Sequence, residues 1–177
     1  MIKVKLLEVE KHRNETTFRP YIQAQHALRE IGIEFVDGDT YDYAWVGQAS
    51  IADKKLPLLE SVERGLEFCS KITGDYLIFD GQDSHSLLGT YEVFKDSNAE
   101  LLLKNTLLRE WAMYRVPTAN GRWYWGPGNY SVPDIDMHSD RIVLSGTNWL
   151  HTAQVKFFDY GEKKHDVCAL FGYPWRS

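Results

Sequence analysis

The sequence contains only two cysteines, Cys69 and Cys168, in 177 residues. Each lies in an apolar pattern without a second cysteine or a histidine at metal-ligand spacing, so we expect two buried free thiols. A chain of this length can bury roughly 70% of the surface that its unfolded form exposes, and it needs neither disulfides nor a structural metal. The cysteine content therefore excludes a small disulfide-stapled scaffold and predicts a cytoplasmic location.

Long apolar runs and basic runs are also missing. Charged residues interrupt every apolar stretch, and none approaches the ~20 residues that span a bilayer. We therefore expect no signal peptide, no anchor and no membrane partner. Twenty Lys and Arg residues against 25 Asp and Glu residues give a formal charge of -5. Nucleic-acid phosphates bind clusters of Lys and Arg residues, and the sequence has no basic run, so we expect no nucleic-acid partner either.

Several well-known catalytic motifs are absent as well. The sequence has no Gly-x-Gly-x-x-Gly, no P-loop, no Gly-x-Ser-x-Gly and no Cys-x-x-Cys pattern. Their absence argues against classical dinucleotide binding, P-loop ATPase chemistry and α/β-hydrolase chemistry.

The residues that are present alternate between the periodicities of strands and helices. The clearest helix is expected to open at Pro57, to continue to Ile72 and to stop at Gly74. It leads into the apolar run 76–79, which is typical of a strand covered on both faces. Further strands are predicted at 2–9, 33–36, 43–46, 101–103, 141–144, 154–158 and 166–171, and further helices at 20–31, 87–94 and 107–114.

This alternation predicts an α/β fold, a Rossmann-like open and mostly parallel sheet with helices on both faces. A long aromatic loop rich in glycine and proline is expected at 117–136. We assign residues 1–164 to one α/β domain. The segment 165–177 is predicted to be a strand that either begins a truncated second domain or forms an edge strand.

The most informative polar residues follow the apolar strand 76–79. Ligands of open α/β sheets bind beyond the carboxyl ends of the strands, and this end carries Asp80, Gln82, Asp83, Ser84 and His85. Carboxylates and a neighbouring histidine suit a general base, so Asp80, Asp83 and His85 are the candidate catalytic residues. Gln82 and Ser84 are candidate substrate-binding residues. The alternative is that the aspartates bond turn amides and cap the next helix.

Two other acidic groups and one aromatic pair are weaker candidates. Asp37, with Asp39 and Asp42 close behind it, is expected at the same sheet edge as Gln48, and Asx turns explain these aspartates equally well. Asp134 and Asp136 would share one side of an extended segment, as a divalent cation requires.

The aromatic pair is Trp123 and Trp125, whose indoles point the same way if the backbone is extended. Paired flat rings suit sugar rings or bases, and the alternative is an aromatic hairpin packed on the sheet. Asp37, Gln48, Trp123 and Trp125 complete the candidate substrate-binding set, and no residue is assigned to a metal.

Five segments resemble an uncharacterised family, the glycosyltransferase-like proteins of the GT-B type found in phages and marine microbes. They are 43–50 (YAWVGQAS), 74–84 (GDYLIFDGQDS), 130–136 (YSVPDID), 144–150 (LSGTNWL) and 165–174 (HDVCALFGYP). The resemblance covers most of the chain and implies its first, acceptor-side domain. In such enzymes a second Rossmann-like domain holds most of the nucleotide-sugar contacts.

The resemblance implies a glycan or small-molecule substrate, a nucleotide sugar as co-substrate and no other cofactor. Because the chain stops where the second domain would begin, we expect little or no transferase activity from it alone. A competing resemblance is to metal-dependent GT-A glycosyltransferases, but Gly81 and Gln82 break the usual Asp-x-Asp spacing. A third hypothesis is a non-catalytic α/β module that binds a ligand or partner through the aromatic loop.

Overall fold

The computed structural model describes residues 1–8, 17–53, 55–81, 86–105, 107, 110–115 and 132–145. Three sets of predictions lie outside these residues. They are the site candidates Gln82, Asp83, Ser84 and His85; the aromatic loop with Trp123 and Trp125; and Cys168 with the segments expected at 154–158 and 165–177.

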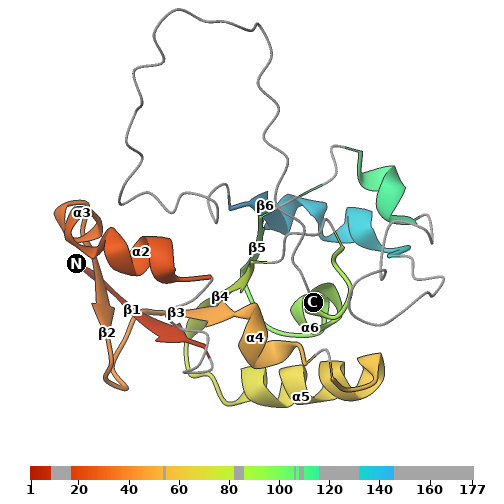
Figure 1. Cartoon of the computed structure of the whole chain (residues 1–177), viewed down its shortest axis with the longest axis horizontal. Coiled ribbons are helices and arrows are strands. Elements are labelled where there is room, and N and C mark those ends of the chain that lie inside the picture. The colour runs from red at the N-terminus through yellow and green to blue at the C-terminus, as the bar shows by residue number, and fades with distance from the viewer. Residues whose placement is uncertain are drawn as a thin grey trace, which may run out of the picture.

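Six parallel strands form one open sheet, which confirms the predicted α/β fold (Figure 1). The strand order is β2-β1-β3-β4-β5-β6, one of the common doubly wound arrangements with one strand added. The strands are β1 (Ile2–Leu7), β2 (Ile33–Val36), β3 (Tyr43–Gly47), β4 (Asp75–Asp80), β5 (Leu101–Lys104) and β6 (Ile142–Leu144).

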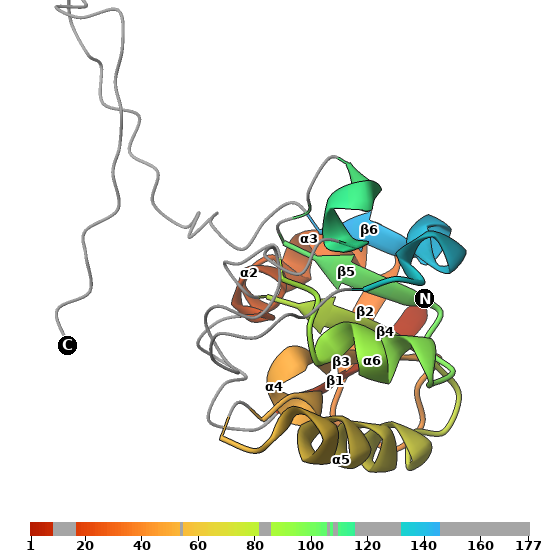
Figure 2. The same cartoon turned by 90° about the vertical axis from the view of Figure 1, so that its right-hand side faces the viewer.

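Helices cover both faces of this sheet, as the alternation predicts (Figures 1 and 2). The α-helices are α2 (Arg19–Gln23), α3 (Gln25–Glu30), α4 (Gln48–Ile51), α5 (Leu58–Ser70) and α6 (Thr90–Lys95). Short 3-10 helices follow at η1 (Trp111–Arg115), η2 (Ile135–Met137) and η3 (Ser139–Arg141). No helix in the described part of the chain is both long and apolar enough to cross a bilayer.

The pleat of the strands divides the core into two layers. Val4, Leu6 and Phe79 point to the face covered by α2, where Phe18 is fully buried. Trp45 and Phe79 meet there with ring centroids 4.9 Å apart. Ala44, Val46, Ile78 and Leu102 point to the opposite face and pack with residues of α4, α5 and α6. Each layer removes apolar area from water, which is the main favourable term in folding.

β2 and β3 lie on opposite sides of β1, and a short connection joins them. Parallel strands usually need a crossover of a dozen residues or more, but only residues 37–42 make this one. Six residues suffice because β2 ends beside Lys5 of β1 and β3 begins beside Val4, almost at the same level. The connection therefore crosses β1 without running back along the length of the sheet. The Lys3 amide fixes the crossing by donating to Asp42 Oδ2 at 2.7 Å.

The helix α5 and the strand β4 lie where the sequence predicts them, and Gly74 between them has a φ of +92°. Cys69 is a buried free thiol as expected, and burial raises its pKa to about 11.

Other predicted boundaries are wrong. The helix expected at 20–31 is divided at Ala24, the helix expected at 87–94 begins only at Thr90, and 107–114 yields the 3-10 helix η1. Gly89, with a φ of +83°, sets the late start of α6.

Substitution of Gly65 tests the packing of α5. A Cβ at this position would meet the Ile51 carbonyl oxygen and would lie 2.6 Å from Val93 Cγ2. Because a backbone atom cannot yield, we expect Gly65→Ala to lower the free energy of unfolding by about 1–3 kcal/mol in urea denaturation. Gly38→Ala is the control, since nothing lies within 4 Å of its Cβ position. Equal stability of the two variants would contradict this packing.

Candidate functional site

The carboxyl ends of the strands meet at one edge of the sheet. Ligands of such sheets bind beyond this edge, at the point where the strand order reverses. Here that point lies between β1 and β3, because β2 was added on one side of β1 and all later strands on the other. The polar residues at or just beyond the described strand ends are Glu8, Asp37, Gln48, Asp80, Lys104, Asn105 and Ser145.

Asp80 lies at this edge, but its carboxylate is committed to an ion pair. Lys104 is its register partner on β5, and Lys104 Nζ donates to Asp80 Oδ1 at 3.1 Å. Both side chains have no solvent exposure. Asp80 does not cap the next helix either: the N-cap of α6 is Gly89, whose amide donates to Glu92 Oε2 at 2.5 Å. The helix-cap interpretation of Asp80 is therefore wrong.

Further hydrogen bonds fasten the three strand ends around this ion pair. The Asn105 amide donates to the Asp80 carbonyl at 3.1 Å, and the Ser145 amide donates to the Lys104 carbonyl at 2.8 Å. The Ser145 hydroxyl also donates to Asn105 Oδ1 at 2.7 Å. A buried ion pair is costly to desolvate and stabilises a fold only with such supporting geometry. The Asp80–Lys104 ion pair therefore helps to hold the carboxyl ends of β4, β5 and β6 together.

The acidic loop follows β2, which stops short of the end of β1. β2 ends at the level of Lys5, two residues before β1 ends, and the chain then turns back across β1. Lys5 Nζ pairs with Asp39 Oδ1 at 2.8 Å. The hydrogen bond that Lys5 donates to Asp39, with a smaller contribution from the charge of Asp37, raises the pKa of the Lys5 ammonium. Asp37 therefore lies at the carboxyl end of β2, two residues short of the level at which β1 ends, while Gln48 follows β3.

Asp134 and Asp136 do not form a paired carboxylate site. The segment is a 3-10 turn rather than extended backbone, so the two side chains diverge. Asp134 Oδ2 accepts from Lys95 Nζ at 3.2 Å, and Asp136 forms an ion pair with Arg115. Among the residues that the structure describes, no group of three or more His, Cys, Asp or Glu side chains is arranged to hold a metal ion.

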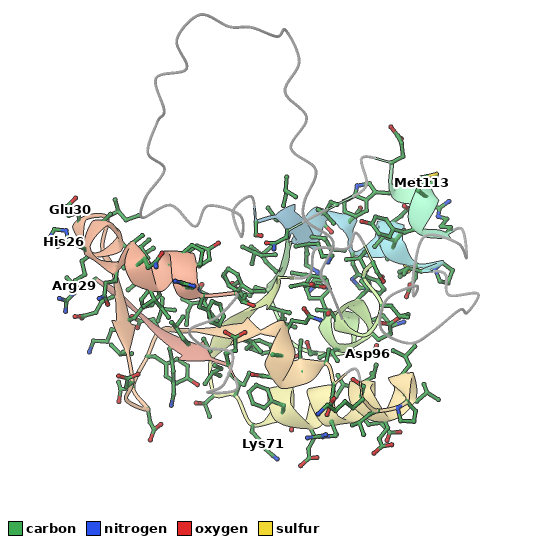
Figure 3. The ribbon with its side chains drawn as sticks, in the orientation of Figure 1. His26, Arg29, Glu30, Lys71, Asp96 and Met113 are labelled. Carbon is green, nitrogen blue, oxygen red and sulfur yellow. The ribbon has the colours of Figure 1, made fainter. Side chains whose placement is uncertain are left out.

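Many other charged residues lie on outer surfaces. Figure 3 shows His26, Arg29 and Glu30 projecting from α3, and Lys71 projecting from the end of α5. Lys71 pairs with Glu67 at 2.7 Å, and His26 lies 3.4 Å from Glu30. Exposed pairs of this kind contribute little free energy and mark a solvated surface.

Glu8 is the functional candidate that the sequence analysis missed. It follows β1 directly, and both oxygens of its carboxylate are buried with no hydrogen bond of normal geometry from the described residues. Burial raises the pKa of this carboxyl to about 7, and the Thr17 hydroxyl opposes only part of that rise. A carboxyl group with a pKa near neutrality can both accept and release a proton, which is the property required of a general base.

Gly47 and Gln48 lie next to Glu8 at the point where the strand order reverses. Leu7 is paired with Val46, and this register sets Glu8 beside Gly47. Gln48, the first residue of α4, therefore shares the edge with Glu8. The Ser50 hydroxyl, from the same helix, donates to the Leu7 carbonyl at 3.4 Å. These contacts tie the start of α4 to the end of β1, around the Glu8 carboxyl.

The sequence held one signal for Glu8. The apolar pattern predicts one strand over 2–9, which makes Glu8 a strand residue, whereas β1 ends at Leu7. Glu8 is a charged residue directly after an apolar pair at a strand end, and Asp80 follows its apolar strand in the same way.

Comparison with known proteins assigns no family. The chain matches no protein-family model, and no curated protein or solved structure shows significant similarity to it.

Removal of the Asp80 charge tests the buried ion pair. Asp80→Asn leaves the Lys104 ammonium buried without a counter-charge, so we expect a loss of about 3–5 kcal/mol in the free energy of unfolding. Urea denaturation at pH 7 measures this loss. Asp75→Asn, at the exposed start of the same strand, is the matched control. If the two variants lose the same small amount, Asp80 and Lys104 are not coupled in the way described.

The protonation of Glu8 gives a second prediction. Its pKa is about 7 in the folded state and near 4.5 ordinarily, so the folded state binds a proton that the unfolded state has released. Stability must then fall as the pH rises from 4.5 to 7, and the penalty persists above pH 7. After allowance for solvent screening, we expect Glu8→Gln to gain about 1–2 kcal/mol at pH 8 and nothing at pH 4.

Thermal denaturation over this pH range measures the difference. Glu63→Gln, on the exposed side of α5, provides the control. Parallel pH profiles for the wild type and Glu8→Gln would show that the Glu8 carboxyl is not buried as described.

Proposed function

We propose that this chain forms the acceptor-side domain of a glycosyltransferase-like protein that uses a nucleotide sugar, and that Glu8 is its general base. The observation that carries the proposal is a buried carboxyl group with a pKa of about 7 at the reversal point of a parallel α/β sheet. The sequence resemblance to proteins of the GT-B type supports the same assignment.

The base has a defined task in this reaction. The Glu8 carboxylate takes the proton from an acceptor hydroxyl, and the acceptor oxygen attacks the anomeric carbon of the donor sugar. A new C–O bond forms, the bond from the anomeric carbon to the diphosphate breaks, and the nucleoside diphosphate leaves with the bonding electrons. A base with a pKa near the working pH is efficient, because it is ionised in much of the population and still accepts a proton readily.

The neighbours of Glu8 suit a neutral acceptor. In this proposal the Gln48 side chain binds sugar hydroxyl groups, since an amide both donates and accepts hydrogen bonds. Gln82, Ser84, Asp83 and His85 remain candidates on the loop after β4, and Trp123 and Trp125 remain candidates for stacking on a sugar ring. The proposal leaves the donor contacts to a carboxy-terminal domain, as the resemblance implies, and places the protein in the cytoplasm.

The ion pair at the end of β4 weighs against the metal-dependent GT-A alternative. That alternative uses the carboxylate at the end of the apolar strand, Asp80, to hold a divalent cation. The Lys104 ammonium, 3.1 Å from Asp80 Oδ1, already neutralises this carboxylate in a position without solvent access. A cation site there would require the buried ammonium to leave, so the acceptor-side assignment is preferred.

Binding of neutral sugars provides the test. We expect glucose, galactose, mannose or N-acetylglucosamine to shift the amide resonances of Gly47 and Gln48 in NMR spectra of the ¹⁵N-labelled chain. UDP and GDP, with or without Mn²⁺, should leave these resonances unchanged. A hydrogen bond to a charged group contributes about 1.5–3 kcal/mol, so Glu8→Gln should weaken sugar binding roughly tenfold or more.

Glu63→Gln should bind the sugars as the wild type does. A manganese-dependent response to a nucleotide would favour the GT-A alternative instead. If no sugar in the panel perturbs Gly47 or Gln48, the acceptor-side assignment fails. If sugars bind equally well to Glu8→Gln, the assignment of Glu8 to the acceptor hydroxyl fails.

A further inference from the structure

Gly47 stands between β3 and α4 in a backbone conformation that does not require glycine. Its φ of -75° and ψ of 141° are ordinary extended values that any residue adopts. Gly32 and Gly74, in contrast, have φ values of +90° and +92°, where a side chain would be strained. The reason for glycine at position 47 must therefore lie in the space around it.

That space is filled by the end of the Glu8 side chain. A Cβ on residue 47 would lie 2.7 Å from both Cδ and Oε1 of Glu8, and 2.9 Å from its Cγ. Glu8 has the same pleat parity as Val4 and Leu6, and Gly47 has the same parity as Trp45, so both point to the face covered by α2. The carboxyl group occupies the volume that a side chain at 47 would take.

We propose that Gly47 is a positioning residue, whose missing side chain allows the Glu8 carboxyl group to lie buried across the carboxyl end of β3. Any larger residue forces this carboxyl group out of its place and toward water. The consequence for catalysis rests on the proposed function of Glu8. The positioning itself does not, because it follows from the contact between these two residues.

A variant at this position should fold. The atoms that an alanine would meet belong to the far end of a flexible side chain, which can rotate away at low cost. This differs from Gly65, where a backbone oxygen stands in the way. Gly47→Ala therefore perturbs the placement of Glu8 selectively.

The pKa of Glu8 reports this placement. We expect ¹³C NMR titration of the labelled glutamate carboxyl groups to give a Glu8 pKa of about 7 in the wild type and a value moved toward 4.5 in Gly47→Ala. The carboxylate regains water when it is displaced, and burial no longer disfavours its charge. Gly38→Ala, a glycine substitution in open space, should leave the Glu8 pKa unchanged. An unchanged Glu8 pKa in Gly47→Ala would overturn the proposal.

A double variant keeps the test decisive if Gly47→Ala folds poorly. Truncation of Glu8 removes the atoms with which the new Cβ collides, so Glu8→Ala/Gly47→Ala should be as stable as Glu8→Ala alone. Coupling of this kind is expected for residues in contact. If the stability changes of the two single variants simply add in the double variant, Gly47 does not act through Glu8.

The sugar panel separates this inference from the proposed function. A lowered Glu8 pKa together with loss of sugar binding in Gly47→Ala supports both. A lowered pKa in a chain that never responds to sugars supports the positioning role and contradicts the acceptor-side assignment.

Discussion

The parallel pairing of β1 with both β2 and β3 is the constraint on which the candidate site depends. Parallel strands deliver all their carboxyl ends to one edge, and a strand that is extended on both sides creates the reversal point where ligands bind. In this sheet β1 has that place, and its register with β3 sets Glu8 beside Gly47. Neither Glu8 nor Gly47 belongs to a known sequence motif. Their place in the candidate site follows from the pairing of β1 with β2 and β3.

Two carboxyl groups at the same edge meet the cost of burial in different ways. Asp80 faces the α5 and α6 layer and keeps its charge beside the Lys104 ammonium. Glu8 faces the α2 layer, has the Thr17 hydroxyl near it and responds to burial with a raised pKa. The pleat separates the two groups, because alternate residues point to opposite faces. Asp80 therefore supports the fold as part of an ion pair, while burial raises the pKa of Glu8 into the range where it exchanges its proton near neutral pH.

Features set by local patterns could be predicted from the sequence, and features set by pairing could not. Periodicity and flanking proline and glycine residues predicted α5, and an unbroken apolar run predicted β4. The partner of Asp80 lies 24 residues away on β5, and no local pattern announces that contact. The end of β1 was missed because an apolar valine follows Glu8 in the sequence. The position of Asp37 relative to the end of β1 depends on how many residues of β2 pair with β1.

Two predicted helices are shorter in the structure than the apolar patterns that predict them. The periodic residues 87–94 include Gly89, whose positive φ delays α6 until Thr90. The chain is divided at Ala24 into α2 and α3, and the Tyr21 ring of α2 packs against Trp45 with ring centroids 5.2 Å apart. Apolar periodicity and local propensity are therefore weak guides to where a helix begins or ends.

The six-residue connection between β2 and β3 also bears on how the protein folds. The free energy needed to close a loop grows with the length of chain enclosed, so contacts near in sequence form at lower entropic cost. β1, β2 and β3 all lie within residues 2–47 of the chain, whereas β4, β5 and β6 lie after residue 74. As the ribosome releases the chain from its amino-terminal end, Glu8 and Gly47 emerge before the strand that carries Asp80. The residues that pair at the reversal point are thus available to the nascent chain before β4, β5 and β6 are.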